Sequence, residues 1–138
     1  MDSRVVEQKL ESLRRCLQRV QEKCPQDAAR LARDLDAQDI VALNLTRAVQ
    51  LCVDIGAHLI AARDAAAPGT MGEVFDALGR EHLISADLAL RMKRAVGFRN
   101  IAVHNYEAIN WDIVFAICRY HLIDFRDFAG AVDALLPP

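Results

Sequence analysis

A run of cationic and hydrogen-bonding residues lies between positions 91 and 106, RMKRAVGFRNIAVHNY. Within it, Arg99, His104 and Tyr106 suit the cleavage of a phosphodiester in RNA without a metal ion. An imidazole can take a proton from the ribose 2′-hydroxyl or return one to the leaving 5′-oxygen. A guanidinium can bind the phosphate and stabilise the charge of the transition state, and a phenol can donate to a phosphate or stack on a base.

Arg99 stands where its helix should face protein. It continues a stripe of apolar residues at helical spacing: Leu88, Met92 and Ala95. A guanidinium buried without a partner is costly, so the position needs a specific reason. On an ideal helix Arg99 and Tyr106 share one face, whereas His104 lies roughly 140° away. One site for all three requires that the helix end or distort near His104, or that a second subunit contribute.

Other polar residues extend this candidate site. We expect Arg91, Lys93 and Arg94 to guide the RNA backbone, because the chain around them is slightly acidic and a site for a polyanion must therefore be local. Asn100 is predicted either to orient the site or to cap the helix.

Asp54 and His58 are polar residues on an otherwise apolar helix. A local hydrogen-bonded pair is one interpretation, and a supporting role near the site is the other. His121 and Asp124 are predicted to form a surface pair. No glutamate precedes a histidine by three residues, as di-iron helical bundles require, so we expect neither a metal nor a cofactor.

The elements that must position these residues are helices. Hydrophobic residues make up 53% of 138, with only 6 Gly and 4 Pro, and the apolar residues recur at helical spacing. The predicted helices run from Val6 to Pro25, from a cap at Asp36 or Asp39 to Pro68, from Thr70 to Gly79, from Ser85, and from Trp111 to the end. The connection between residues 26 and 38 has at most a helical turn. We predict one all-α domain over residues 1–138, an antiparallel up-and-down bundle of four main helices plus a short one.

Composition excludes several classes of protein. A formal charge of -2 argues against a uniformly basic surface for nucleic acid. The four cysteines form no Cys-x-x-Cys pair, which favours free thiols over a disulfide framework. The first residues lack an apolar signal core, and no run approaches the ~20 apolar residues of a membrane span. A cytoplasmic protein without a membrane partner is the expectation.

The segment GFRNIAVHNY, from Gly97 to Tyr106, resembles the Arg-x-x-x-x-His-x-Tyr block of HepT-like proteins in the HEPN superfamily. NLTRAVQLCVDIGAHLIA, from Asn44 to Ala61, is similar to the central helix of that family. The turn from Pro68 to Thr70, followed by Glu73, Phe75 and Leu78, also looks like the family pattern. The resemblance covers residues 40–135, and the first helix matches only in its amphipathic character.

The resemblance implies an all-helical homodimer whose motif residues line a cleft between subunits. It implies a metal-independent endoribonuclease, the toxin of a toxin–antitoxin pair. The implied partner is a minimal nucleotidyltransferase (MNT) antitoxin, which attaches AMP to the motif tyrosine, here Tyr106, and so silences the toxin. The implied catalytic residues are Arg99, Asn100, His104 and Tyr106.

Two other interpretations stay open. The same helical dimer could be a non-catalytic module that binds a nucleotide or a partner nucleotidyltransferase through its arginine cluster. A purely structural bundle would leave Arg99 and His104 unexplained. Loss of toxicity in His104→Ala would separate an enzyme from a binding module, because a module has no toxicity to lose.

Overall fold

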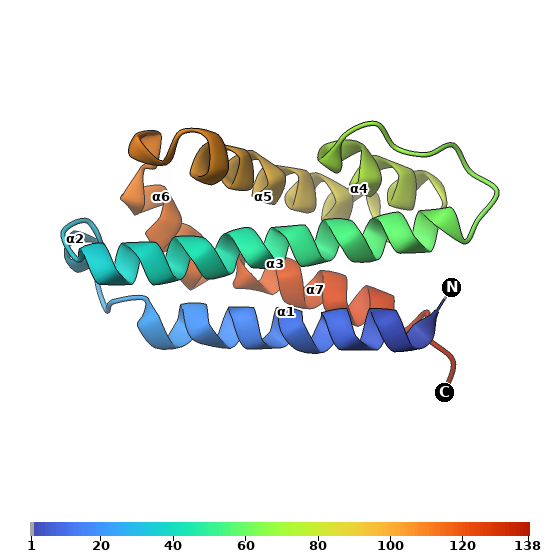
Figure 1. Cartoon of the computed structure of the whole chain (residues 1–138), viewed down its shortest axis with the longest axis horizontal. Helices are drawn as coiled ribbons and strands as arrows, with labels where there is room; N and C mark the ends of the chain where they lie inside the picture. Colours follow the sequence, from blue (N-terminus) through green and yellow to red (C-terminus); the bar gives the residue numbers. More distant parts are fainter. Residues whose placement is uncertain (1) are drawn as a thin grey trace.

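The computed structural model describes residues 2–138, and every regular element in that range is helical. Four long segments run up and down against one another, and both ends of the chain lie at the same end of the bundle (Figure 1). They are α1 Ser3–Lys23, α3 Leu35–Ala61, α5 Ala86–His104, and a last segment of α6 Trp111–Ala116, the π-helical η2 Ile117–His121 and α7 Leu122–Asp133. Between them lie α2 Ala28–Leu31, α4 Met71–Arg80 and the 3₁₀ turn η1 Tyr106–Ala108. The predicted all-α antiparallel bundle is confirmed.

The central helix is α3, which contacts α1, α4, α5 and α7. By length and composition it could cross a membrane, with a mean hydropathy of 1.4 over its most apolar window. The prediction that no run approaches a membrane span missed this. In this structure the buried side chains of α3 face the neighbouring helices. They include Val41, Leu45, Ala48, Cys52 and Ile55. Packing on several sides accounts for so apolar a helix.

The start of α3 differs from the prediction. Asp34, rather than Asp36 or Asp39, caps the helix, because its Oδ1 accepts a hydrogen bond of 3.0 Å from the backbone N–H of Ala37. Asp36 falls in the first turn and Asp39 in the second, where a side chain no longer reaches the free N–H groups of the helix end. The carboxylate of Asp39 is therefore available for another partner.

The short helix α4 begins as predicted. The hydroxyl of Thr70 accepts from the N–H of Glu73 at 3.2 Å, and the Glu73 carboxylate accepts from the N–H of Gly69 at 2.8 Å. Gly79 does not end α4, which continues to Arg80 before His82 turns the chain with a φ of 57°.

Side chains of α4 pack closely against the backbone of α3 at Gly56. A Cβ atom at Gly56 would lie 2.5 Å from Cγ1 of Val74 and 3.0 Å from Cδ1 of Leu78. Only glycine permits this spacing. Since α4 also packs on α5, the contact helps to hold the start of α5, which Ser85 caps as predicted.

The last segment is one long run, as predicted, but with a π turn in the middle. Asn110 caps its start by accepting from the N–H groups of Asp112 and Ile113. A π turn holds an extra residue and changes which side chains face the core on its two sides. The uninterrupted α periodicity assumed from the sequence was therefore wrong at residues 117–121.

The four cysteines are free thiols, as predicted. Burial raises the pKa of the thiols of Cys52 and Cys118 well above the usual range. Buried thiols of this kind are unreactive, so they belong to the core.

Candidate active site at the end of α5

The helix that carries the motif ends inside it. His104 is the last residue of α5, and Asn105 leaves the helix with φ −152° and ψ 66° while its N–H still donates to the carbonyl of Ile101. Tyr106 then starts the 3₁₀ turn η1. The helix ends at His104, so the angle of an ideal helix no longer separates His104 from Tyr106. Arg99 and His104, however, both lie within α5 and stay roughly 140° apart around its axis. A single site for these two residues therefore still requires a second subunit.

Arg99 is half-buried on the inward side of α5. Its Nη1 donates to Oδ1 of Asn100 at 3.3 Å, and its Nη2 donates weakly to Oε1 of Gln50 at 3.5 Å. Among the buried side-chain polar atoms of residues 2–138, Nε of Arg99 alone has no hydrogen-bond partner. A buried donor without a partner costs free energy, and functional sites are places where that cost is tolerated.

The partner of Arg99 is an amide and not a carboxylate. Gln50 accepts from Arg99, while its Nε2 donates to Oδ1 of Asp54 at 2.8 Å. The other oxygen of Asp54 lies 3.7 Å from Nζ of Lys9. The positive charge of the guanidinium is thus oriented without being neutralised. Sequence reasoning missed Gln50, although its place four residues before Asp54 on an apolar helix was a signal.

The predicted pair of Asp54 and His58 does not form. Nε2 of His58 accepts from the backbone N–H of Asp2 at 3.1 Å, and Asp54 faces Gln50 and Lys9. The side chains of Asp54 and His58 thus contact different neighbours. Of the two, Asp54 supports the surroundings of Arg99, whereas His58 ties the first residues of the described chain to α3.

Tyr106 has a single strong polar partner. Its hydroxyl donates to Oδ1 of Asp39 at 2.6 Å, and its ring packs edge-on against Trp111 with the centroids 5.9 Å apart. Burial, the bond to Asp39 and the charges of Asp39 and Glu107 raise the pKa of Tyr106 above the usual range of a tyrosine. The phenol is therefore neutral and fixed in direction, while 37% of the residue stays exposed.

His104 is exposed at the end of α5. The ring of Trp111 packs on Tyr106. The structure thus places an accessible imidazole, an oriented guanidinium and an oriented phenol on the last two turns of α5 and the residues just after them. Asn100 accepts from Arg99, and the helix is capped by Asn105, so the predicted capping role of Asn100 is wrong.

Comparison with known proteins agrees with the motif. The family model described as ribonuclease HepT-like matches residues 13–132. The chain belongs to this family. It is 34% identical over 130 residues to the mRNA nuclease HepT of Shewanella oneidensis, covering 94% of this chain and 97% of that protein.

Two solved structures show the same fold. A toxin–antitoxin complex with AMP-PNP contains a chain with 33% identity and a TM-score of 0.89, covering 94% of this chain and 98% of that one. A tri-AMPylated HEPN toxin of Shewanella oneidensis in complex with an MNT antitoxin has 34% identity and a TM-score of 0.88, covering 94% and 97%. The fold of this HepT-like chain is thus that of the HEPN toxins.

The three cations upstream of the motif are less free than the sequence suggested. Arg91 donates to Asp87, Asp124 and Asp127 at 2.8 to 2.9 Å, and these bonds, Asp124 first, raise its pKa. Lys93 pairs with Asp76 at 3.1 Å. Within residues 2–138 Arg94 is the member of the three without a carboxylate partner. Arg91 and Lys93 therefore do not form the expected free cationic track with Arg94.

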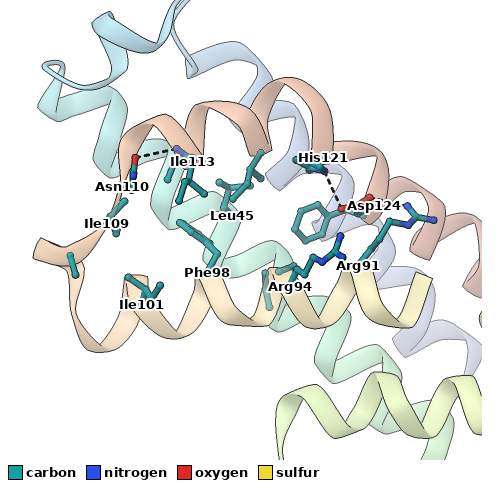
Figure 2. Close-up of a pocket in the computed structure, with 16 residues that line it drawn as sticks. Leu45, Arg91, Arg94, Phe98, Ile101, Ile109, Asn110, Ile113, His121 and Asp124 are labelled. Atoms are coloured by element: carbon teal, nitrogen blue, oxygen red, sulfur yellow. Dashed lines mark hydrogen bonds and ion pairs between the residues drawn. The ribbon is translucent and has the colours of Figure 1, made fainter. Parts of the chain in front are cut away.

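A cavity of about 420 Å³ lies on another face of α5 of this HepT-like chain, between α5 and the last segment. Figure 2 shows the charged groups Arg91, Arg94 and Asp124 at one end of it and the apolar Ile101 and Ile109 toward the other. His121 pairs with Asp124 there at 3.7 Å, as predicted. None of Arg99, His104 and Tyr106 lines this cavity, so it is separate from the motif.

Proposed function

We propose that this HepT-like chain is the endoribonuclease toxin of a toxin–antitoxin pair, that it cuts RNA without a metal ion, and that AMP on Tyr106 silences it. The observation that carries the proposal is the presence, five residues apart near the end of α5, of an accessible imidazole and of a guanidinium that is oriented but not neutralised. Membership of a ribonuclease family supports it.

In this mechanism His104 exchanges the protons. It removes the proton of the ribose 2′-hydroxyl or protonates the 5′-oxygen that leaves. Arg99 binds the phosphate, and its guanidinium stabilises the negative charge that builds up in the transition state. Asn100 holds the guanidinium, and Tyr106 contacts a phosphate oxygen.

The site faces a second copy of the chain in this proposal. Leu43 on α3 and Val103 on α5 are 50% and 48% exposed. Leu43 follows Asp39 by one helical turn and Val103 follows Arg99 by one turn, so both apolar side chains flank the motif. Exposed apolar side chains next to a polar site are typical of a subunit interface, and in a two-fold dimer the two sites would then lie close together.

Modification of Tyr106 explains how the toxin is switched off. An AMP group brings a negative phosphate and a bulky nucleoside into the space that the RNA backbone needs. The solved structure of an AMPylated Shewanella toxin with an MNT antitoxin supports the same partner for this chain. Tyr106 is 37% exposed and therefore accessible to such an enzyme.

The decisive experiment is RNA cleavage by the purified wild type and by His104→Ala, each in excess EDTA. The wild type should cut with its rate unchanged by EDTA, and His104→Ala should be slower by about 100-fold or more. His121→Ala is the matched control, because that imidazole is exposed on α7's side of the bundle and lies outside the motif. Equal rates for His104→Ala and wild type, or a requirement for a divalent metal, would contradict the mechanism.

A further inference from the structure

The bond between Tyr106 and Asp39 joins residues 67 positions apart in the chain. Asp39 sits in the second turn of α3, and Tyr106 begins η1 after α5. At 2.6 Å the bond has the length of a strong hydrogen bond to an ionised acceptor. The mechanism proposed for RNA cleavage does not use Asp39, so this contact needs an explanation of its own.

We propose that Asp39 is a catalytic residue for the modification of this chain: it takes the phenolic proton of Tyr106 when the tyrosine oxygen attacks a nucleoside triphosphate. This inference rests on the proposed modification of Tyr106 and adds the group that makes it chemically possible. The toxin thereby supplies part of the machinery that silences it.

The proposed transfer forms one bond and breaks another at the α-phosphorus of ATP. The Oη atom of Tyr106 forms a bond to the α-phosphorus of ATP held by the nucleotidyltransferase. The bond between that phosphorus and the oxygen bridging to the β-phosphate breaks, and pyrophosphate leaves with its electron pair. The phenolic proton passes to Oδ1 of Asp39 along the existing hydrogen bond. The products are the AMP ester of Tyr106, pyrophosphate and a protonated Asp39, which returns its proton to water.

A base is needed because the phenol does not ionise by itself near neutral pH. The surroundings of Tyr106 raise its pKa, so a preformed phenolate is rarer here than for a tyrosine in water. Removing the proton during the attack avoids that intermediate. Burial is the first cause of the raised pKa, and the hydrogen bond and charge of Asp39 add to it. The contribution of the Asp39 charge ends when the proton moves to that carboxylate.

The geometry favours Asp39 over the other nearby acid. Glu107, the next residue in η1, adds negative charge near the phenol, but the hydroxyl donates to Asp39. Trp111 of α6 packs edge-on against the ring of Tyr106 and brings no acidic group to the phenol. Asp39 and Tyr106 are both exposed residues, so the pair lies on a surface that a nucleotide can approach.

The test measures AMP incorporation into Tyr106 by a purified minimal nucleotidyltransferase antitoxin with ATP, under single-turnover conditions over a range of pH, by intact-mass spectrometry. Asp39→Asn keeps an oxygen that can accept from the hydroxyl but cannot take the proton. We expect its rate to fall by about 100-fold or more and to rise about tenfold per pH unit, as a reaction that needs hydroxide does. Glu107→Gln, the matched control, should stay within about twofold of the wild type.

The outcomes separate the two proposals. No AMP on the wild type under conditions where the two proteins bind would refute the modification of Tyr106 and this inference with it. Modification of the wild type with an equal rate and pH profile in Asp39→Asn would overturn the inference alone, because the proton would then go to a group of the nucleotidyltransferase. Circular dichroism and binding to the antitoxin establish that Asp39→Asn is folded, and Asp39→Glu, which restores a carboxylate, should regain part of the rate.

Discussion

Two arginines on α5, eight residues apart, have opposite surroundings. Arg91 donates to three carboxylates, and one of them, Asp124, is buried. Arg99 donates to two amide oxygens and has a buried Nε without a partner. The guanidinium of Arg91 is neutralised by its own chain, which serves stability. That of Arg99 is held in place with its charge available to a ligand, which serves binding and catalysis.

The largest expected effect is on RNA cleavage. Arg99→Ala should lower kcat/KM by about 1,000-fold, since it removes the group proposed to stabilise the transition-state charge. Arg91→Ala should retain activity within about threefold, because this arginine points its charge at carboxylates. The measurement is cleavage of one defined RNA by both variants at equal concentrations of folded protein. Similar losses in both would end the distinction between the two arginines.

The sequence predicts where an arginine lies on its helix better than it predicts which residues the arginine contacts, because those residues can be far away in the chain. The helical spacing of Leu88, Met92 and Ala95 with Arg99 was enough to predict a half-buried guanidinium. It could not name Gln50, because this residue comes from α3 and its contact with Arg99 depends on how α3 packs on α5. The same limit applies to Arg91, whose partner Asp124 lies 33 residues away.

The sequence predicted helix caps best where the capping side chain bonds to a nearby backbone group. The caps of Thr70 and Ser85 were read from spacing alone, since a cap bonds to a backbone group within a few residues. The start of α3 was misplaced because Asp34, Asp36 and Asp39 all had the right chemistry, and only the backbone shows which one lies outside the helix. The π turn at residues 117–121 gave no signal in the spacing of apolar residues.

For the free energy of unfolding the order should be reversed, so that replacing Arg91 costs more than replacing Arg99. Arg91→Ala leaves the buried Asp124 without its main partner and should lower the free energy of unfolding by about 1 to 3 kcal/mol. Arg99→Met keeps the apolar part of the side chain and removes the unpartnered Nε, so it should change stability by less than about 0.5 kcal/mol. Urea denaturation followed by circular dichroism measures both. A larger loss for Arg99→Met would mean that Arg99 is structural.

A smaller effect is expected when Arg99 is given the surroundings of Arg91. Gln50→Glu places a carboxylate beside the guanidinium, which should raise KM for RNA about tenfold with less change in kcat, because the phosphate must then displace a bound anion. Asp54→Asn is the control, since it weakens the contact with Lys9 but keeps the acceptor of Gln50. It should stay within about twofold of the wild type. Unchanged KM in Gln50→Glu would show that Gln50 does not orient Arg99.

The smallest expected effect concerns the cations beside Arg91. Arg94 is exposed and has no carboxylate partner within residues 2–138, whereas Lys93 pairs with Asp76, so Arg94 is the better candidate for a contact with the RNA backbone. Arg94→Ala should weaken RNA binding about threefold at moderate salt and lower the slope of log affinity against log salt by about 0.7, the value for one phosphate of a single strand. Lys93→Ala should leave that slope unchanged. The comparison uses fluorescence anisotropy of a labelled RNA with His104→Ala as the background, so that cleavage does not interfere. Equal slopes for the two variants would place the RNA path away from this part of α5 and leave Arg99 as the only arginine of the helix that binds it.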